Sequence, residues 1–305
     1  MVADKNLSVS LCGLTLKNPV VPASGTFGFG IELADAMDLN ALGGISLKGT
    51  TREARYGNPT PRIAECFAGM INSVGLQNPG IEALVSDKAP ALRRIYDGVI
   101  IANISGYSVE EYAYNCARAD ACPAINLLEV NVSCPNVHGG GMAFGTDPKS
   151  AAAVTAAVKA VTRKPVFIKL SPNVTDIVSI ARACEDAGAD GITLVNTFLG
   201  MRIDIRRRKP VLANKMGGFS GPAVFPVALR MVWQVAHACA IPVMGCGGVR
   251  RAEDVVEMMM AGATAVQVGA ENLRNPTACP EIAAALPALM DELGVNSLQE
   301  IIGIV

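Results

Sequence analysis

Short β-rich runs alternate with helix-length segments along this chain of 305 residues, and that alternation constrains its fold more than any other feature. Repeated βα units with apolar strands predict a parallel sheet covered by helices. Eight units predict a closed (β/α)8 TIM barrel of the α/β class. The helical patterns include residues 151–161, 176–187, 223–239 and 252–261. The β-rich runs are residues 19–23, 44–48, 99–104, 127–132, 166–170, 191–196, 242–246 and 265–269.

Two matching turns support the repeat. Ala-Gly-Ala-Asp at 187–190 and Ala-Gly-Ala-Thr at 261–264 both place a glycine where a helix ends and turns into the next strand. A doubly wound open sheet is the competing architecture, but no Gly-x-Gly-x-x-Gly follows any of the predicted strands. We therefore expect a single barrel domain over residues 1–305, with a short N-terminal β-hairpin at about 7–17 and an active-site loop at 135–145.

Composition excludes several classes of function. The formal net charge is −1, so the chain lacks the basic surface that nucleic-acid binding requires. Its first ten residues carry Asp4 and Lys5 and no apolar signal core, and no run approaches the roughly 18 apolar residues of a membrane span. We expect a cytoplasmic protein without a membrane segment.

The 9 cysteines are scattered, with no Cys-x-x-Cys pair, and only 2 histidines could add imidazole ligands. This pattern argues against a disulfide framework, a zinc site or an iron–sulfur cluster in this chain. We expect no bound metal.

Polar and glycine residues follow the predicted strands. In a (β/α)8 barrel the carboxyl ends of the strands meet at one face and form the active site. Each such residue alone could simply close a turn or cap a strand, but together they predict a site. They are Ser24, Lys48, Asn103, Asn131, Cys134, Lys169, Asn196, Thr197, Gly247, Gly248, Gly269 and Ala270.

Glycines after the last two strands suggest a phosphate site. Barrels commonly hold a phosphate there with exposed backbone N–H groups. A plain tight turn is the alternative for Gly247 and Gly248, but Gly269 and Ala270 form a second such turn. The pair favours a phosphorylated cofactor or substrate.

Cys134 is a candidate catalytic thiol. It follows the strand at 127–132 and precedes the glycine-rich segment 137–141. An isolated cysteine most often acts as a small buried hydrophobe, but here amide side chains surround it in Asn-Val-Ser-Cys-Pro-Asn at 131–136.

Several further motifs are spread over essentially the full length of the chain. With the Cys134 motif, they are Asn-Pro-Val-Val-Pro-Ala-Ser-Gly at 18–25, Ser-Leu-Lys-Gly-Thr-Thr at 46–51, Gly-Asn-Pro at 57–59, Asn-Ser-Val-Gly-Leu-Gln-Asn-Pro-Gly at 72–80, Val-Asn-Thr at 195–197, Gly-Phe-Ser-Gly-Pro at 218–222 and Gly-Cys-Gly-Gly-Val at 245–249. Together these motifs resemble one enzyme family, the dihydroorotate dehydrogenases. The resemblance implies an FMN-containing (β/α)8 barrel that oxidises (S)-dihydroorotate to orotate in pyrimidine (UMP) biosynthesis.

The resemblance implies a role for each matching residue. Cys134 would be the base that removes the C5 proton while a hydride leaves C6 for FMN, and a cysteine here is typical of the soluble class 1 enzymes. The implied substrate residues are Lys48, Asn72, Ser73, Val74, Gly75, Leu76, Asn131, Asn196 and Thr197. The implied FMN residues are Ser24, Lys48, Gly49, Asn103, Asn131, Lys169, Val195, Gly221, Gly247, Gly248, Gly269 and Ala270. Many relatives have Thr where Ala270 stands, so we expect one phosphate contact fewer.

Residues 201–210 and 217–221 resemble the NAD-linked class 1B enzymes. That class implies a homodimer of this chain within a heterotetramer, whose second subunit carries FAD and a [2Fe-2S] cluster. The charges of Arg206, Arg207, Arg208 and Lys209, taken alone, indicate a solvated loop more readily than a partner contact.

Two alternatives stay open from the sequence. A flavoenzyme like dihydropyrimidine dehydrogenase would share much of the pattern, and turnover of dihydrouracil would identify it. A nonredox phosphate-binding barrel would purify without flavin colour.

Overall fold

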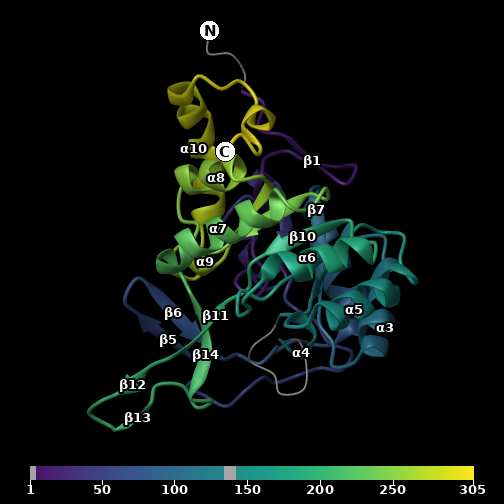
Figure 1. Ribbon diagram of the computed structural model, residues 1–305, viewed down its shortest axis with the longest axis vertical. Helices are drawn as coiled ribbons and strands as arrows, with labels where there is room; N and C mark the ends of the chain where they lie inside the picture. Colours follow the sequence, from purple (N-terminus) through teal and green to yellow (C-terminus); the bar gives the residue numbers. More distant parts are fainter. Residues whose placement is uncertain (1–4, 134–141) are drawn as a thin grey trace.

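The computed structural model describes residues 5–133 and 142–305, and a sheet of eight strands forms its centre (Figure 1). Neighbours pair in the order β3-β16-β15-β10-β9-β8-β7-β4, always in parallel. The predicted (β/α)8 barrel is confirmed, because each strand overlaps one predicted run. The strands are β3 (Val20–Pro22), β4 (Gly44–Ser46), β7 (Val99–Ile104), β8 (Leu127–Asn131), β9 (Val166–Lys169), β10 (Gly191–Leu194), β15 (Val243–Cys246) and β16 (Ala263–Val268).

Between β3 and β4 the barrel is closed by one backbone hydrogen bond, and these two strands do not form a regular β-ladder. The Gly43 N–H donates to the Val20 carbonyl oxygen at 3.1 Å. A Cβ on residue 43 would lie 1.9 Å from the Asn18 carbonyl oxygen, so only glycine allows this approach. The Asn18 side chain accepts from the Val20 N–H at 3.0 Å and donates to the Ala41 carbonyl at 2.8 Å, which fixes the two edges together.

Helices cover the outside of the sheet (Figure 1). Side chains of Ser108, Asp147 and Asp176 accept hydrogen bonds from the first turns of α3, α5 and α6, where backbone N–H groups lack helical partners. The long helices are α3 (Val109–Asp120), α5 (Pro148–Lys159), α6 (Ile177–Asp186), α7 (Phe225–Ala236), α8 (Ala252–Met260) and α10 (Ala278–Leu293). The short ones are α1 (Ile81–Ala83), α2 (Ala89–Arg93), α4 (Met142–Gly145) and α9 (Ala270–Arg274), with single turns at η1 (Ile31–Leu33), η2 (Leu39–Ala41), η3 (Leu84–Lys88), η4 (Pro222–Val224) and η5 (Leu298–Ile301).

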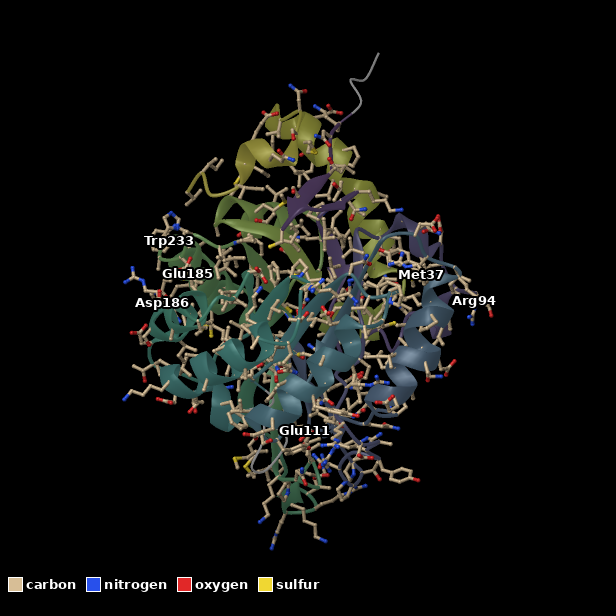
Figure 2. The ribbon with its side chains drawn as sticks, turned by 90° about the vertical axis from the view of Figure 1, so that its right-hand side faces the viewer. Met37, Arg94, Glu111, Glu185, Asp186 and Trp233 are labelled. Carbon is tan, nitrogen blue, oxygen red and sulfur yellow. The ribbon has the colours of Figure 1, made fainter. Side chains whose placement is uncertain are left out.

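The outer faces of these helices are polar. Figure 2 shows Arg94 and Asp186 at the edge of the molecule, while every residue of the barrel strands is buried except the half-buried Thr264 in β16. Gly188 and Gly262 end α6 and α8 with φ of 94° and 112°, as expected for glycines that turn a helix into a strand. Over residues 5–133 and 142–305, no helix combines the length and apolarity that crossing a membrane would take.

An antiparallel hairpin of β1 (Val9–Leu11) and β2 (Leu14–Leu16) precedes the barrel. Leu11 and Leu16 are fully buried in the main core, so the hairpin packs against the barrel and is not a free arm.

A second sheet lies at the end of the barrel opposite the two chain termini (Figure 1). It is antiparallel, in the order β11-β14-β6-β5, and brings the segment after β4 beside the segment after β10. Its strands are β5 (Ile63–Cys66), β6 (Gly69–Asn72), β11 (Phe198–Met201) and β14 (Met216–Ser220). The sequence pattern did not predict this sheet.

A small hairpin of β12 (Ile203–Asp204) and β13 (Lys209–Pro210) extends beyond that sheet (Figure 1). Arg206, Arg207 and Arg208 form its turn and are exposed, which agrees with a solvated segment.

Candidate active site

One cavity opens at the carboxyl ends of the barrel strands, beneath the second sheet. Polar groups from β4, β8, β9 and β10 reach it, and glycines follow β15 and β16. This convergence is what a (β/α)8 barrel imposes on its strand ends. The predicted site residues that line it are Ser24, Lys48, Gly49, Asn72, Val74, Gly75, Leu76, Asn131, Lys169, Val195, Asn196, Thr197, Gly221, Gly247, Gly248, Gly269 and Ala270.

Two residues predicted to contact ligands do not line the cavity. Ser73 is buried, and its hydroxyl accepts from the side-chain amides of Asn58 at 3.2 Å and Asn214 at 3.1 Å. Asn103 is also buried and donates to Glu129 Oε1 at 2.6 Å, one layer deeper in the barrel. Both therefore support the walls of the cavity from behind. Cys134 lies outside the described residues, so its role as base stays a prediction.

The second sheet supplies walls that sequence reasoning did not assign to the site. Ile63, Met70, Phe219 and Ser220 line the cavity from β5, β6 and β14. Ile63, Met70 and Phe219 add apolar surface to the cavity, as ligand sites usually have.

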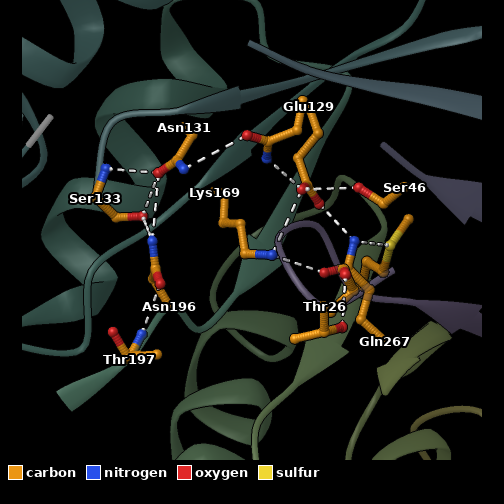
Figure 3. A network of polar contacts seen from close by, with 12 residues as sticks. Thr26, Ser46, Glu129, Asn131, Ser133, Lys169, Asn196, Thr197 and Gln267 are labelled. Carbon is orange, nitrogen blue, oxygen red and sulfur yellow. Dashed lines mark hydrogen bonds and ion pairs between the residues drawn. The ribbon is translucent and has the colours of Figure 1, made fainter. Parts of the chain in front are cut away.

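Three side chains form an amide and hydroxyl cluster on one wall (Figure 3). Asn196 Nδ2 donates to Ser133 Oγ at 2.9 Å, and Ser133 Oγ donates to Asn131 Oδ1 at 2.9 Å. The Ser133 N–H also donates to Asn131 Oδ1, at 3.2 Å. Ser133 immediately precedes Cys134, so this cluster fixes the point where the chain leaves β8 for the predicted catalytic loop.

A buried lysine forms the floor of the cavity (Figure 3). Lys169 is only 4% exposed and its Nζ lies 3.5 Å from Glu129 Oε1, a carboxylate within the barrel. Its Nζ also donates to Gln267 Oε1 at 2.8 Å. Neither Glu129 nor Gln267 was predicted, although a charged residue within an apolar strand was a usable signal.

Cys246 also lines the cavity, but as a neutral thiol. Burial raises its pKa above the ordinary value, and nearby Glu129 adds to the increase while Lys169 opposes it. All cysteines that the structure describes are unpaired. In the same residues, no group of three or more His, Cys, Asp or Glu side chains could hold a metal ion.

Glycines form a cradle at the other end of the cavity. Gly221 and Gly248 have φ of 116° and 78°, in the region that favours glycine. A Cβ on residue 248 would lie 2.7 Å from Phe225 Cβ and 2.9 Å from the Gly221 carbonyl oxygen. Within the described part of the chain, no acceptor is found for the N–H groups of Gly247, Gly248 and Gly269. Free backbone donors without side chains suit a phosphate group.

Gly248→Ala should therefore weaken binding of a phosphorylated ligand, such as the FMN that the resemblance implies, by about tenfold or more, because the methyl group forces this cradle apart. Gly294→Ala is the matched control. Gly294 has φ of 69° but nothing within 4 Å of its Cβ position, so this variant strains the backbone without touching the cavity. Fluorescence titration with FMN measures the affinity of both variants. Equal affinities would show that Gly248 does not contribute to the phosphate site.

Fold and site together define a class of protein. A (β/α)8 barrel with amides, a buried lysine and a glycine cradle at the carboxyl ends of its strands is suited to be an enzyme that uses a phosphorylated ligand.

Comparisons with known proteins agree. A sequence model described as dihydroorotate dehydrogenase matches residues 6–290. Three similar proteins carry the name dihydroorotate dehydrogenase B (NAD(+)), catalytic subunit. The one from Enterococcus faecalis is 54% identical over 97% of this chain and 95% of its own length. Those from Exiguobacterium sibiricum and Geobacillus kaustophilus are each 54% identical over 97% of this chain, and over 96% and 95% of their own lengths. The chain belongs to the dihydroorotate dehydrogenase family, as its motifs indicated.

Proposed function

We propose that this chain is the catalytic subunit of an NAD-linked dihydroorotate dehydrogenase, an oxidoreductase that converts (S)-dihydroorotate to orotate in pyrimidine biosynthesis. The observation that carries the proposal is one cavity that combines the Asn131 and Asn196 amides, the buried Lys169 and the glycine cradle. The 54% identity to proteins of that name supports it.

The residues of the cavity fit FMN. The N–H groups of Gly247, Gly248 and Gly269 have no acceptor in the described chain, and a Cβ at residue 221, 247 or 248 would clash. The residues that would hold the phosphate are therefore Gly221, Gly247, Gly248, Gly269 and Ala270. Residue 270 is alanine, so backbone N–H groups replace a hydroxyl contact there. Residues along the cavity would line the flavin: Ser24, Lys48, Gly49, Asn131, Lys169 and Val195. When bound, FMN supplies a two-electron acceptor for hydride.

The amides suit a pyrimidine substrate. Dihydroorotate has alternating N–H and C=O groups and a carboxylate, and each Asn side chain both donates and accepts. Asn72, Asn131 and Asn196 would bind the ring from β6, β8 and the end of β10. Lys48 would pair with the carboxylate. The backbone at Gly75 and Leu76 and the Thr197 hydroxyl would complete the site.

Cys134 would remove the C5 proton. The thiolate takes that proton on one face of the ring, and the ring double bond forms as hydride leaves C6 on the other. Ser133, hydrogen-bonded to Asn131 and Asn196, would keep the base next to the amides that hold the substrate.

Anaerobic addition of dihydroorotate should bleach the flavin absorbance of the purified protein near 450 nm. Dihydrouracil, which lacks the carboxylate, should leave that absorbance unchanged. A colourless protein that cannot be reconstituted with FMN would contradict the proposal. Bleaching by dihydrouracil but not by dihydroorotate would indicate a dihydropyrimidine dehydrogenase instead.

Electrons would leave through a second subunit. The matched relatives are named catalytic subunits and NAD(+)-linked, which supports a separate partner that handles NAD. We propose that the partner carries FAD and a [2Fe-2S] cluster and that two copies of each chain form a cytoplasmic heterotetramer. This chain purified alone should reduce an artificial dye but not NAD, and full NAD reduction without a partner would contradict the assembly.

A further inference from the structure

A buried carboxylate lies directly beneath the proposed flavin site, and no step of the proposed reaction uses it. The Glu129 side chain is 0% exposed in the middle of β8, and its one ion pair in the described chain is with Lys169. Burying two charges is costly, so a pair this deep needs all its hydrogen bonds satisfied.

In the described chain, every side chain that contacts this carboxylate donates a hydrogen bond to it (Figure 3). Oε1 accepts from Ser46 Oγ at 3.2 Å and from Asn103 Nδ2 at 2.6 Å, besides Lys169. Oε2 accepts from Gln267 Nε2 at 2.5 Å. A glutamine at 129 would turn an N–H toward one of these donors, so the site suits a carboxylate, whose two oxygens both accept.

The side-chain amide of Gln267 joins Glu129 to Lys169 and fixes the direction of both hydrogen bonds. Its Nε2 donates to Glu129, so its Oε1 must face the other way, where it accepts from Lys169 Nζ at 2.8 Å. Glu129 and Gln267 thus accept hydrogen bonds from two of the three N–H groups of the Lys169 ammonium, on its side away from the cavity. The third remains for a ligand in the cavity that Lys169 lines.

We infer that Glu129 is a positioning residue that pairs with Lys169 and aims its ammonium group into the cavity, where it acts on charge that develops on the bound flavin. This inference rests on the proposed function. The other described titratable side chains on the cavity wall are Lys48 and Cys246. Cys246 is neutral, and Lys48 lies beside Gly25, 3.7 Å from its Cβ position.

A double-mutant cycle on stability tests the coupling without substrate. Glu129→Gln leaves the Lys169 charge buried and unpaired, so Tm should fall by about 6–10 °C. Adding Lys169→Met removes that charge and should recover part of the loss. A double variant no more stable than Glu129→Gln would show that Glu129 serves only Ser46 and Asn103, and would overturn the inference.

Sulfite affinity tests the action on the flavin. Sulfite adds to oxidised flavin as an anion, so its dissociation constant reports positive charge nearby. At one or more pH values between about 6 and 9, Glu129→Gln should change that constant at least about fivefold from wild type, since Lys169 then loses the carboxylate that pairs with its ammonium group and orients it. Ser46→Ala, which removes a neutral donor to the same carboxylate, should leave it unchanged.

A Glu129→Gln constant within fivefold of wild type throughout that range would overturn the inference while the wild type still binds FMN. A wild-type protein without flavin would instead overturn the proposed function, and this inference with it.

Discussion

Cys134→Ala should lower the rate of flavin reduction by dihydroorotate by about 10²–10⁴-fold while FMN stays bound. A positioned base contributes a factor of this size, and alanine has no group that can accept the C5 proton. Anaerobic stopped-flow absorbance at saturating dihydroorotate measures the step directly. Cys134→Ser should also be slow, because a serine hydroxyl is a far weaker base than a thiolate.

The pH dependence should identify the thiol. An unperturbed cysteine has a pKa near 8.5 and only the deprotonated form is a base, so the rate should rise about tenfold per pH unit below that pKa and level off above it. Cys12→Ser is the matched control, since Cys12 is an exposed thiol on the N-terminal hairpin. Although residue 12 is exposed as a whole, its Sγ donates to the Asp190 carbonyl oxygen at 3.2 Å and is partly desolvated there. That desolvation, followed by the charge of Asp190, raises the pKa of Cys12 to about 11, so it does not titrate in this range. A wild-type rate unchanged from pH 6 to 9 would remove Cys134 from the mechanism.

The barrel was predictable because its strands are buried on both faces. Such strands read as continuous apolar runs, and β7 and β8 have no exposed residue at all. The second sheet lacked this signal. In β5 the burial alternates between exposed and half-buried, and β14 begins Met-Gly-Gly, so neither segment resembles a core strand. Their pairing joins residues far apart in sequence and depends on the finished barrel.

The same burial explains why the depth of the site residues could not be predicted from the sequence. A strand end can be located from sequence, which brought Lys169, Asn131 and Asn196 to the cavity correctly. When both faces are buried, however, no polar alternation tells which side chains point into the barrel or how deep they lie. The sequence therefore did not indicate that Asn103 lies behind the cavity wall, bonded to Glu129, and its contact with the flavin stays a prediction. Glu129 was not selected because it stands within an apolar run.

Lys169→Met should lower the rate of flavin reduction by about 10²–10³-fold, because it removes the buried cation of the cavity and leaves Lys48 as the one lysine among the described lining residues. Methionine keeps the length of the side chain but has no charge and no N–H. The variant also leaves Glu129 buried without its counterion, so a loss of stability must be separated from a loss of catalysis.

Two further variants make that separation. Glu129→Gln with Lys169→Met removes both charges, so it should recover stability but not rate. Lys159→Met makes the same change in the half-exposed pair with Asp190, whose atoms are 2.6 Å apart, and should leave the rate unchanged. Recovery of rate together with stability in the double variant would mean that Lys169 matters only as a partner for Glu129. Continued slow reduction in a stable protein would mean that its ammonium group acts on the flavin itself.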